Sequence, residues 1–274
     1  MSVSYEGVLE VSEDLVLFLS GLLNGERLRR GTRSGTRALT PYRQAVLVLR
    51  WLIDDTRMTC LARDNNVSVS TAYAYRDEAV GVLAARRPSL HGALLAARAA
   101  GHTHVILDGT LIETDRIHTR GPTPGVDLWW SGKHQRHGGN IQVVSAPDGW
   151  PLWTSNVRPG REHDTTAARA DPRLLDDLRA WLDEEHRALA DLGYEGEKDF
   201  LHVPFKTPAG GCLTVNQKAH NSLHSAVRAL GERANSLLKT TFKALRRWRG
   251  CPWRTGDIVA AALVLLHHEN DRTT

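Results

Sequence analysis

Near residue 100 the spacing of apolar residues changes from helical to strand-like, and this change limits the chain to a few architectures. Upstream, Val46, Leu49 and Ile53 recur at helical intervals, as on the buried face of an amphipathic helix. Downstream, short apolar runs such as 105–107 are followed by Asp-Gly, a pattern typical of buried strands. Helices followed by mixed strands and helices predict an α/β fold with a mixed sheet behind an all-α segment. We therefore expect a helical domain over 1–95 and an α/β domain over 100–270.

The helical domain has a pattern that two kinds of module share. Residues 41–84 predict two short helices, a turn at "NNVSVS" and a third helix capped by Ser68 or Ser70. This is the layout of a helix-turn-helix, whose last helix enters the major groove of DNA with its exposed first turns. A three-helix packing module without a DNA role has the same layout. On the first interpretation, the candidate DNA contacts are Ser70, Thr71, Tyr75 and Arg76.

Residues 1–24 and 24–41 precede this module and differ in character. The first segment has apolar residues at helical spacing and predicts one or two helices. The second is rich in Gly and Arg without periodicity, so it is a loop that either contacts phosphates or is a solvated linker.

Charge is distributed unevenly along the second half of the chain. Residues 161–199 hold twelve acidic and six basic residues, whereas 202–254 hold ten Lys or Arg and a single carboxylate, Glu232. A basic segment of this kind favours a polyanion such as double-stranded DNA, with a membrane surface as the competing partner. The three cysteines are far apart in the sequence and form no C-x-x-C pair, which argues against a disulfide framework and a cysteine zinc site.

Two aspartates follow apolar strands and precede or adjoin a glycine. Asp108 lies in "VILDGT" and Asp191 in "ALADLGY". Ligands bind at strand ends in open α/β sheets, so the two carboxylates converge if their strands are neighbours. The alternative is that each aspartate only caps or turns the chain, as Asp-Gly pairs commonly do.

Glu232 lies in a long predicted helix and calls for a separate explanation. An intrahelical ion pair with Arg228 would contribute only about 0.2–0.5 kcal/mol. The expected core stripe of this helix is apolar and lies on another face: Leu223, Val227, Leu230, Ala234, Leu237 and Leu238. If Glu232 joins Asp108 and Asp191, the carboxylates repel by roughly 4 kcal/mol per pair at about 4 Å. Hard oxygen ligands then favour Mg²⁺ or Mn²⁺, and two such ions suit chemistry at phosphorus.

Five motifs in order give the second domain a family resemblance. "LDGT", "SGKHQRHGGNIQVV", "GREHDTT", "ADLGYEG" and "RALGERANSLLK" together resemble the DDE-type insertion-sequence transposases related to Harbinger elements. The resemblance implies a ribonuclease-H-like fold with Asp108, Asp191 and Glu232 as the metal-binding catalytic triad. The family's helix signature matches at Arg228, Glu232 and Lys239, but Ser225 stands where the family has Tyr. That departure puts in doubt any DNA contact made by the tyrosine.

The same resemblance suggests roles for other residues, each with a plainer alternative. Lys133 and His134 would contact DNA, or form a solvated basic turn. His163 and Asp164 would lie near the metals, although Asp164 equally suits a helix cap. Tyr194 would line the site or only pack. Candidate contacts to the DNA backbone lie on the Glu232 face of the long helix: Arg228, Lys239 and Lys243.

The resemblance implies a DNA transposase that cuts element ends and joins 3′-OH ends to target DNA by metal-dependent phosphoryl transfer. A metal-dependent endonuclease without strand transfer and a DNA-binding regulator with an idle catalytic domain are the alternatives. The expected partners are double-stranded DNA and further copies of the chain on that DNA. An acidic N-terminus unlike a signal peptide, and an apolar run at 258–266 too short to span a bilayer, predict a cytoplasmic, nucleoid-associated protein with no membrane partner.

Overall fold

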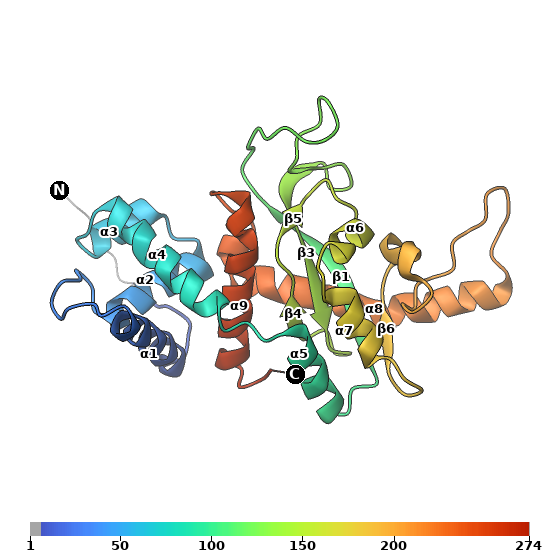
Figure 1. Cartoon of the computed structure of the whole chain (residues 1–274), viewed down its shortest axis with the longest axis horizontal. Coiled ribbons are helices and arrows are strands. Elements are labelled where there is room, and N and C mark those ends of the chain that lie inside the picture. The colour runs from blue at the N-terminus through green and yellow to red at the C-terminus, as the bar shows by residue number, and fades with distance from the viewer. Residues whose placement is uncertain (1–6, 274) are drawn as a thin grey trace.

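The first part of the chain forms a group of four helices (Figure 1). The computed structural model describes residues 7–273. The four helices are α1 (Glu13–Arg29), α2 (Pro41–Asp54), α3 (Met58–Asp64) and α4 (Val69–Ala84). Helix α1 continues to Arg29, so the loop that we expected from residue 24 starts later. Residues 1–6 of the predicted N-terminal helical segment lie outside the described residues.

Hydroxyl side chains define where three of these helices begin. Ser12, Thr40 and Ser68 each accept a hydrogen bond from a backbone N–H of the first turn that follows. Such caps satisfy one of the otherwise unpaired N–H groups and contribute about 1 kcal/mol each. Of the two serines predicted to cap α4, Ser68 is therefore the cap.

The second part of the chain contains one mixed sheet. Its strands are β1 (His104–Glu113), β2 (Trp130–Ser131), β3 (Arg136–Ser145), β4 (Pro151–Thr154), β5 (Arg158–Pro159) and β6 (Arg187–Leu189). Strand β3 pairs antiparallel with β1, β2, β4 and β5, whereas β6 pairs parallel with β1. The predicted hairpin about Asp-Gly is confirmed, with Gly149 at a positive φ in the turn between β3 and β4.

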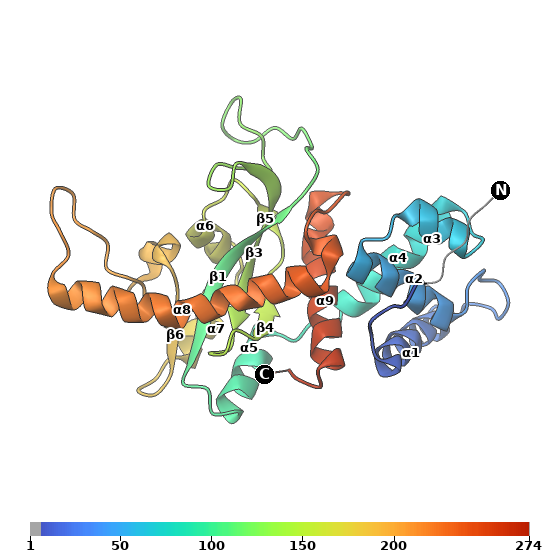
Figure 2. The ribbon, with the colours of Figure 1, turned by 180° about the vertical axis from the view of Figure 1, so that it is seen from behind.

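Helices cover both faces of this sheet (Figures 1 and 2). They are α5 (Leu90–Ala99), α6 (Asp164–Arg169), α7 (Leu174–Trp181), α8 (Val215–Thr241) and α9 (Thr255–Glu269), with short 3₁₀ turns at Leu192–Glu197 (η1), Lys243–Leu245 (η2) and Pro252–Arg254 (η3). Helix α8 crosses one face of the sheet, and α6 and α7 lie on the other. The mixed sheet between helical layers, with α1–α4 ahead of it, confirms the ribonuclease-H-like α/β fold class and the all-α N-terminal region.

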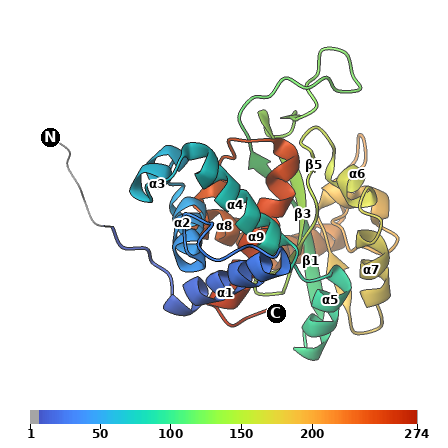
Figure 3. The same ribbon diagram turned by 60° about the vertical axis from the view of Figure 1, so that its left-hand side comes forward.

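Helix α9 joins the two parts of the molecule. It contacts α4 and α1 on one side and β4 on the other, and it stands between the N-terminal helices and the sheet (Figures 1 and 3). Its expected core residues Ile258, Ala262, Leu265 and Leu266 are buried. A helix that is apolar on nearly all sides suits this enclosed position. The division at 95–100 stays a prediction; α5, which spans it, packs on β4 and α7.

The expected core stripe of α8 is only partly correct. Leu223 is 68% exposed and Leu230 38% exposed, whereas Ala234 and Leu238 are buried as predicted. The buried positions of α8 are His224, Gly231, Ala234 and Leu238, so Leu223 and Leu230, each one residue before a buried position, lie about 100° around the helix from the packed face. The N-terminal half of α8 extends beyond the sheet as an arm (Figure 2). Where α8 does meet the sheet it presents Gly231, at which a Cβ atom would approach the Ile106 side chain to 2.6 Å.

Candidate functional site

Asp108 and Asp191 lie at the same level of two neighbouring strands. Strands β1 and β6 are parallel, and their last pair joins Ile106 to Leu189. Two residues further on, each chain segment reaches its aspartate. Strand β6 has ended there while β1 continues, so this edge of β1 is open to side chains from the surrounding helices. The predicted neighbouring strands are therefore present, and they bring both carboxylates to one edge of the sheet.

Asp108 is largely enclosed and receives its polar contacts from α8. Asn235 Nδ2 donates a hydrogen bond to Asp108 Oδ2 at 2.8 Å, and Arg228 Nη2 lies 3.7 Å from Asp108 Oδ1. Burial raises the pKa of Asp108 to about 6; the charge of Arg228 opposes this rise, while the charges of Asp191 and Asp164 add to it. A carboxyl group that is held this close to other carboxylates is poised to gain a cation.

Glu232 lies on the stretch of α8 that runs beside β1. Gly231 packs on Ile106, Asn235 bonds to Asp108, and Lys239 bonds to Thr110, so α8 follows β1 in the same direction. Glu232 is one turn before the Asn235 contact, and its side chain is exposed. Within residues 7–273 no three His, Cys, Asp or Glu side chains form a group that could hold a metal ion. The metal triad thus stays a prediction, with Asp108 and Asp191 adjacent and Glu232 on the neighbouring helix.

Asp164 approaches the same sheet edge from α6, of which it is the first residue. A Cβ atom on Gly109 would lie 2.7 Å from Asp164 Cγ, and one on Gly193 would lie 2.7 Å from Asp191 Oδ1 and 3.2 Å from Asp164 Oδ2. Two glycines therefore make room for this carboxylate between the Asp108 and Asp191 segments. His163, the residue before it, is exposed and caps α6 without a side-chain hydrogen bond.

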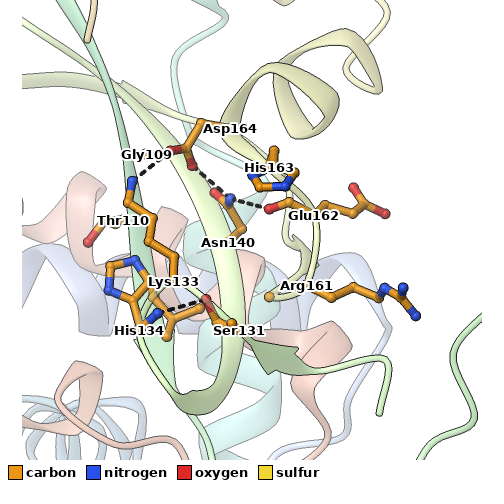
Figure 4. Close-up of a pocket in the computed structure, with 13 residues that line it drawn as sticks. Gly109, Thr110, Ser131, Lys133, His134, Asn140, Arg161, Glu162, His163 and Asp164 are labelled. Atoms are coloured by element: carbon orange, nitrogen blue, oxygen red, sulfur yellow. Dashed lines mark hydrogen bonds and ion pairs between the residues drawn. The ribbon is translucent and has the colours of Figure 1, made fainter. Parts of the chain in front are cut away.

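A cavity of about 250 Å³ opens beside Asp164 (Figure 4). Lys133 and His134, from the turn between β2 and β3, line it together with Thr110 of β1 and Asn140 of β3. Lys133 Nζ donates to Asp164 Oδ2 at 3.0 Å. His134 is largely exposed, but partial removal of its ring from solvent, together with the neighbouring Lys133 charge, lowers its pKa. The two residues predicted to contact DNA thus lie at the mouth of a polar cavity next to the aspartates.

A buried chain of hydrogen bonds connects the Asp191 segment to Asp164. The Tyr194 hydroxyl donates to Gln142 Oε1, Gln142 Nε2 donates to Asn140 Oδ1 at 2.9 Å, and Asn140 Nδ2 donates to Asp164 Oδ1 at 2.9 Å. Tyr194 is fully buried and supports the site from within rather than lining an opening. Asn140 and Gln142 were not predicted from the sequence. Their signal was two amides at alternate positions of an otherwise apolar strand, which places both on one face.

The four residues predicted to contact DNA from the helix-turn-helix differ in how buried they are. Ser70 is exposed and Thr71 half-buried at the start of α4, as expected. Tyr75 and Arg76 were expected on the exposed surface, but both are buried. The Tyr75 hydroxyl accepts a hydrogen bond from the backbone N–H of Leu39.

Arg76 is enclosed by aromatic rings at the junction of the two parts of the chain. Its guanidinium lies 4.6–5.2 Å from the ring centroids of Trp51, Tyr73 and Trp248, and it also bonds to Asp77. Positions 72, 75, 76 and 79 share the inner face of α4, which explains why these two side chains turn inward.

The three cations expected to contact the DNA backbone all have protein partners. Arg228 pairs with Asp108, and Lys243 pairs with Asp54 of α2 at 3.1 Å. Lys239 Nζ donates to Thr110 Oγ1 and to the carbonyl of Leu111, and burial lowers its pKa. Lys243, moreover, is in η2, past the end of α8, and not on the helix face where we expected it. The expected row of cations free to bind phosphate is therefore not present. A role for each of them on DNA remains a prediction.

Comparison with known proteins gives the family. The model of the family described as DDE superfamily endonuclease matches residues 107–267, which is more than half of the chain. No curated protein sequence matches significantly. Among solved structures, the Mos1 transposase paired-end complex and the Mos1 strand transfer complex are each 14% identical to this chain. Both cover 89% of it, the match spans 85% and 84% of their own chains respectively, and both have a TM-score of 0.22. The range matched by the family model contains Asp108, Asp191 and Glu232. The chain belongs to the DDE superfamily of endonucleases.

Proposed function

We propose that this endonuclease is an insertion-sequence transposase that cuts the ends of its element and joins the 3′-OH ends to target DNA. The observation that carries the proposal is the alignment of Asp108 with Asp191 on parallel strands, beside the helix that bears Glu232. Acidic side chains from the middle of β1, from just past the end of β6 and from one helix are a suitable set for metal-assisted transfer of a phosphoryl group. The match to the DDE superfamily endonucleases supports the nuclease activity in this proposal.

The side chains of the site suit a hard divalent cation. Asp108, Asp191 and Glu232 offer only oxygen ligands, which favour Mg²⁺ or Mn²⁺ over zinc. Asn235 Oδ1, beside Asp108, is buried without a hydrogen-bond partner among the described residues, so it is an open acceptor for a hydrated cation. Bound there, a pair of ions would supply charge stabilisation and a more nucleophilic oxygen at neutral pH.

Residues around the carboxylates would position the catalytic side chains and the DNA. Asn235 and Arg228 hold the Asp108 side chain from α8, the same helix that carries Glu232. Lys133 and His134, at the cavity mouth, are placed to meet a DNA strand entering along the open edge of β1. Ser70 and Thr71, in the first turn of α4, remain accessible for contacts within a helix-turn-helix. Such positioning accounts for much of the catalysis in transfers of this kind.

The proposal is tested with the full-length chain and a labelled duplex that carries an end of its own element. With Mg²⁺ and a supercoiled target plasmid, we expect cleavage at the element end and covalent joining of the freed 3′-OH strand to the plasmid. Cleavage without joining would identify an endonuclease that does not transfer strands. Sequence-specific binding with no cleavage in Mg²⁺ or Mn²⁺ would identify a regulator with an idle catalytic domain. The size of the complex on DNA, measured by light scattering, tests the expected homo-oligomer.

A further inference from the structure

Lys133 reaches into the site from an exposed turn. The turn joins β2 to β3, and Gln135 within it adopts a left-handed conformation, which reverses the chain in a few residues. From there the Lys133 side chain crosses to Asp164, as Figure 4 shows. The side chain of Lys133 is 57% exposed, but that of Asp164 is only 11% exposed. One partner of this ion pair is therefore free to turn toward solvent, and the other is enclosed.

Asp164 is the fixed partner. Its Oδ1 atom accepts from Asn140, which is held in turn by Gln142 and the buried Tyr194 hydroxyl. Its position at the start of α6, against Gly109, allows little displacement. Breaking the Lys133 contact would thus leave Asp164 in place with its amide partner.

The ammonium of Lys133 interacts with more than one carboxylate. Burial lowers the pKa of Lys133, but the hydrogen bond with Asp164 and the charges of Asp164, Asp191 and Asp108 outweigh that effect and raise it. Arg228 also lies near Asp108, but its side chain is 16% exposed and is held on α8. Lys133 is the more exposed of these two cations, and it occupies the side of the site that opens into the cavity.

We propose that Lys133 is a movable counter-ion, which neutralises the aspartates in the metal-free protein and turns to a backbone phosphate when DNA enters the adjacent cavity. This inference rests on the carboxylate site of the proposed function. While Lys133 stays on Asp164, a divalent cation must compete with it for the same negative charge. When a phosphate holds Lys133, the carboxylates are free for the cation. Metal binding and DNA binding then strengthen each other, and the coupling acts equally in both directions.

The test measures Mn²⁺ binding to the full-length protein by electron paramagnetic resonance, without DNA. Lys133→Met should bind Mn²⁺ about tenfold more tightly than the wild type, which is within the usual range for coupling between two sites. Arg136→Met is the matched control, because Arg136 is an exposed cation near the same turn that pairs with Glu113. This control should bind Mn²⁺ like the wild type. Lys133→Gln replaces Lys133→Met if circular dichroism shows that the methionine variant does not fold.

A second arm adds a short DNA duplex of unrelated sequence. The wild type should bind Mn²⁺ about tenfold more tightly in its presence, and Lys133→Met should show little change. Equal Mn²⁺ affinity of wild type and Lys133 variants without DNA would overturn the proposal, as would equal gains on adding DNA. The Asp191→Asn variant distinguishes a failure of the counter-ion role of Lys133 from a failure of the proposed carboxylate site. If Asp191→Asn binds Mn²⁺ like the wild type, the carboxylate site itself is wrong; if it loses Mn²⁺ while Lys133 variants are unchanged, only the counter-ion role fails.

Discussion

Replacing Asp108 by Asn should stabilise the metal-free protein while destroying its response to metal. The pKa of Asp108 rises from 3.8 to about 6 on folding, chiefly because the carboxyl group is buried. Between pH 4 and 6 the folded chain keeps a proton that the unfolded chain releases, so stability falls as pH rises through this window. At about 1.4 kcal/mol per pKa unit, the ionised carboxylate lowers the free energy of unfolding by up to about 3 kcal/mol above pH 6. The amide of Asp108→Asn carries no charge, so the variant escapes this loss.

The assay is urea unfolding in EDTA at several pH values. Asp108→Asn should exceed the wild type by up to about 3 kcal/mol at pH 8, and the difference should shrink as pH falls toward 4. Millimolar Mg²⁺ or Mn²⁺ should then stabilise the wild type, because the ion binds only the folded state, and should have little effect on the variant. Asp176→Asn, which alters a 77% exposed aspartate on α7, is the control and should change neither quantity. A wild type that is the more stable protein at pH 8 in EDTA would refute the reasoning.

Three further substitutions test how the structure holds the site. Gly109→Ala should lower the free energy of unfolding in urea by about 1–3 kcal/mol, because its Cβ would meet Asp164. Gly132→Ala, with open space around the added Cβ, should leave this free energy unchanged, and equal effects of the two changes would contradict the close packing at Gly109. Lys239→Ala should lower the free energy of unfolding by roughly 1–3 kcal/mol, since it removes two hydrogen bonds made by a charged group, while the exposed Lys218→Ala should be neutral. Arg76→Ala should weaken binding to all DNA sequences alike, because it loosens the contact between α4 and Trp248. If only binding to the element end weakens, Arg76 reads bases as the sequence first suggested.

The sequence predicts the order of elements and the strands beside the two aspartates better than it predicts which side chains face outward. The apolar run before each aspartate correctly indicated a strand. The Asp-Gly turn expected at Asp108 is wrong, because β1 continues through Asp108 to Glu113, and only Asp191 follows the end of its strand. Helical periodicity gives the faces of a helix but not what lies against each face. Leu223 satisfied the periodicity of α8 and is nevertheless exposed, because the next residue, His224, is the one that packs inward beside His202.

The burial of Arg76 and the role of Asn140 depend on partners that are distant in sequence. Trp248 lies more than 170 residues from Arg76, and no pattern in the sequence indicates that their side chains are in contact. Asn140 supports Asp164 only because α6 folds back over β3. Lys239 was predicted to contact DNA, and its hydrogen bonds to β1, which follow from the path of α8 along that strand, were not predicted.

The most direct test of the account measures single-turnover cleavage of an element-end duplex in Mg²⁺ by Asp108→Asn, Asp191→Asn and Glu232→Gln. Each variant should lose about a hundredfold or more in rate while binding the duplex about as tightly as the wild type. Glu184→Gln, at an exposed carboxylate outside the site, should cleave normally. Glu232 is the decisive position, because its side chain is exposed and Glu232→Gln should leave the fold intact. Cleavage by Glu232→Gln at the wild-type rate would contradict the assignment of the three carboxylates to one catalytic site.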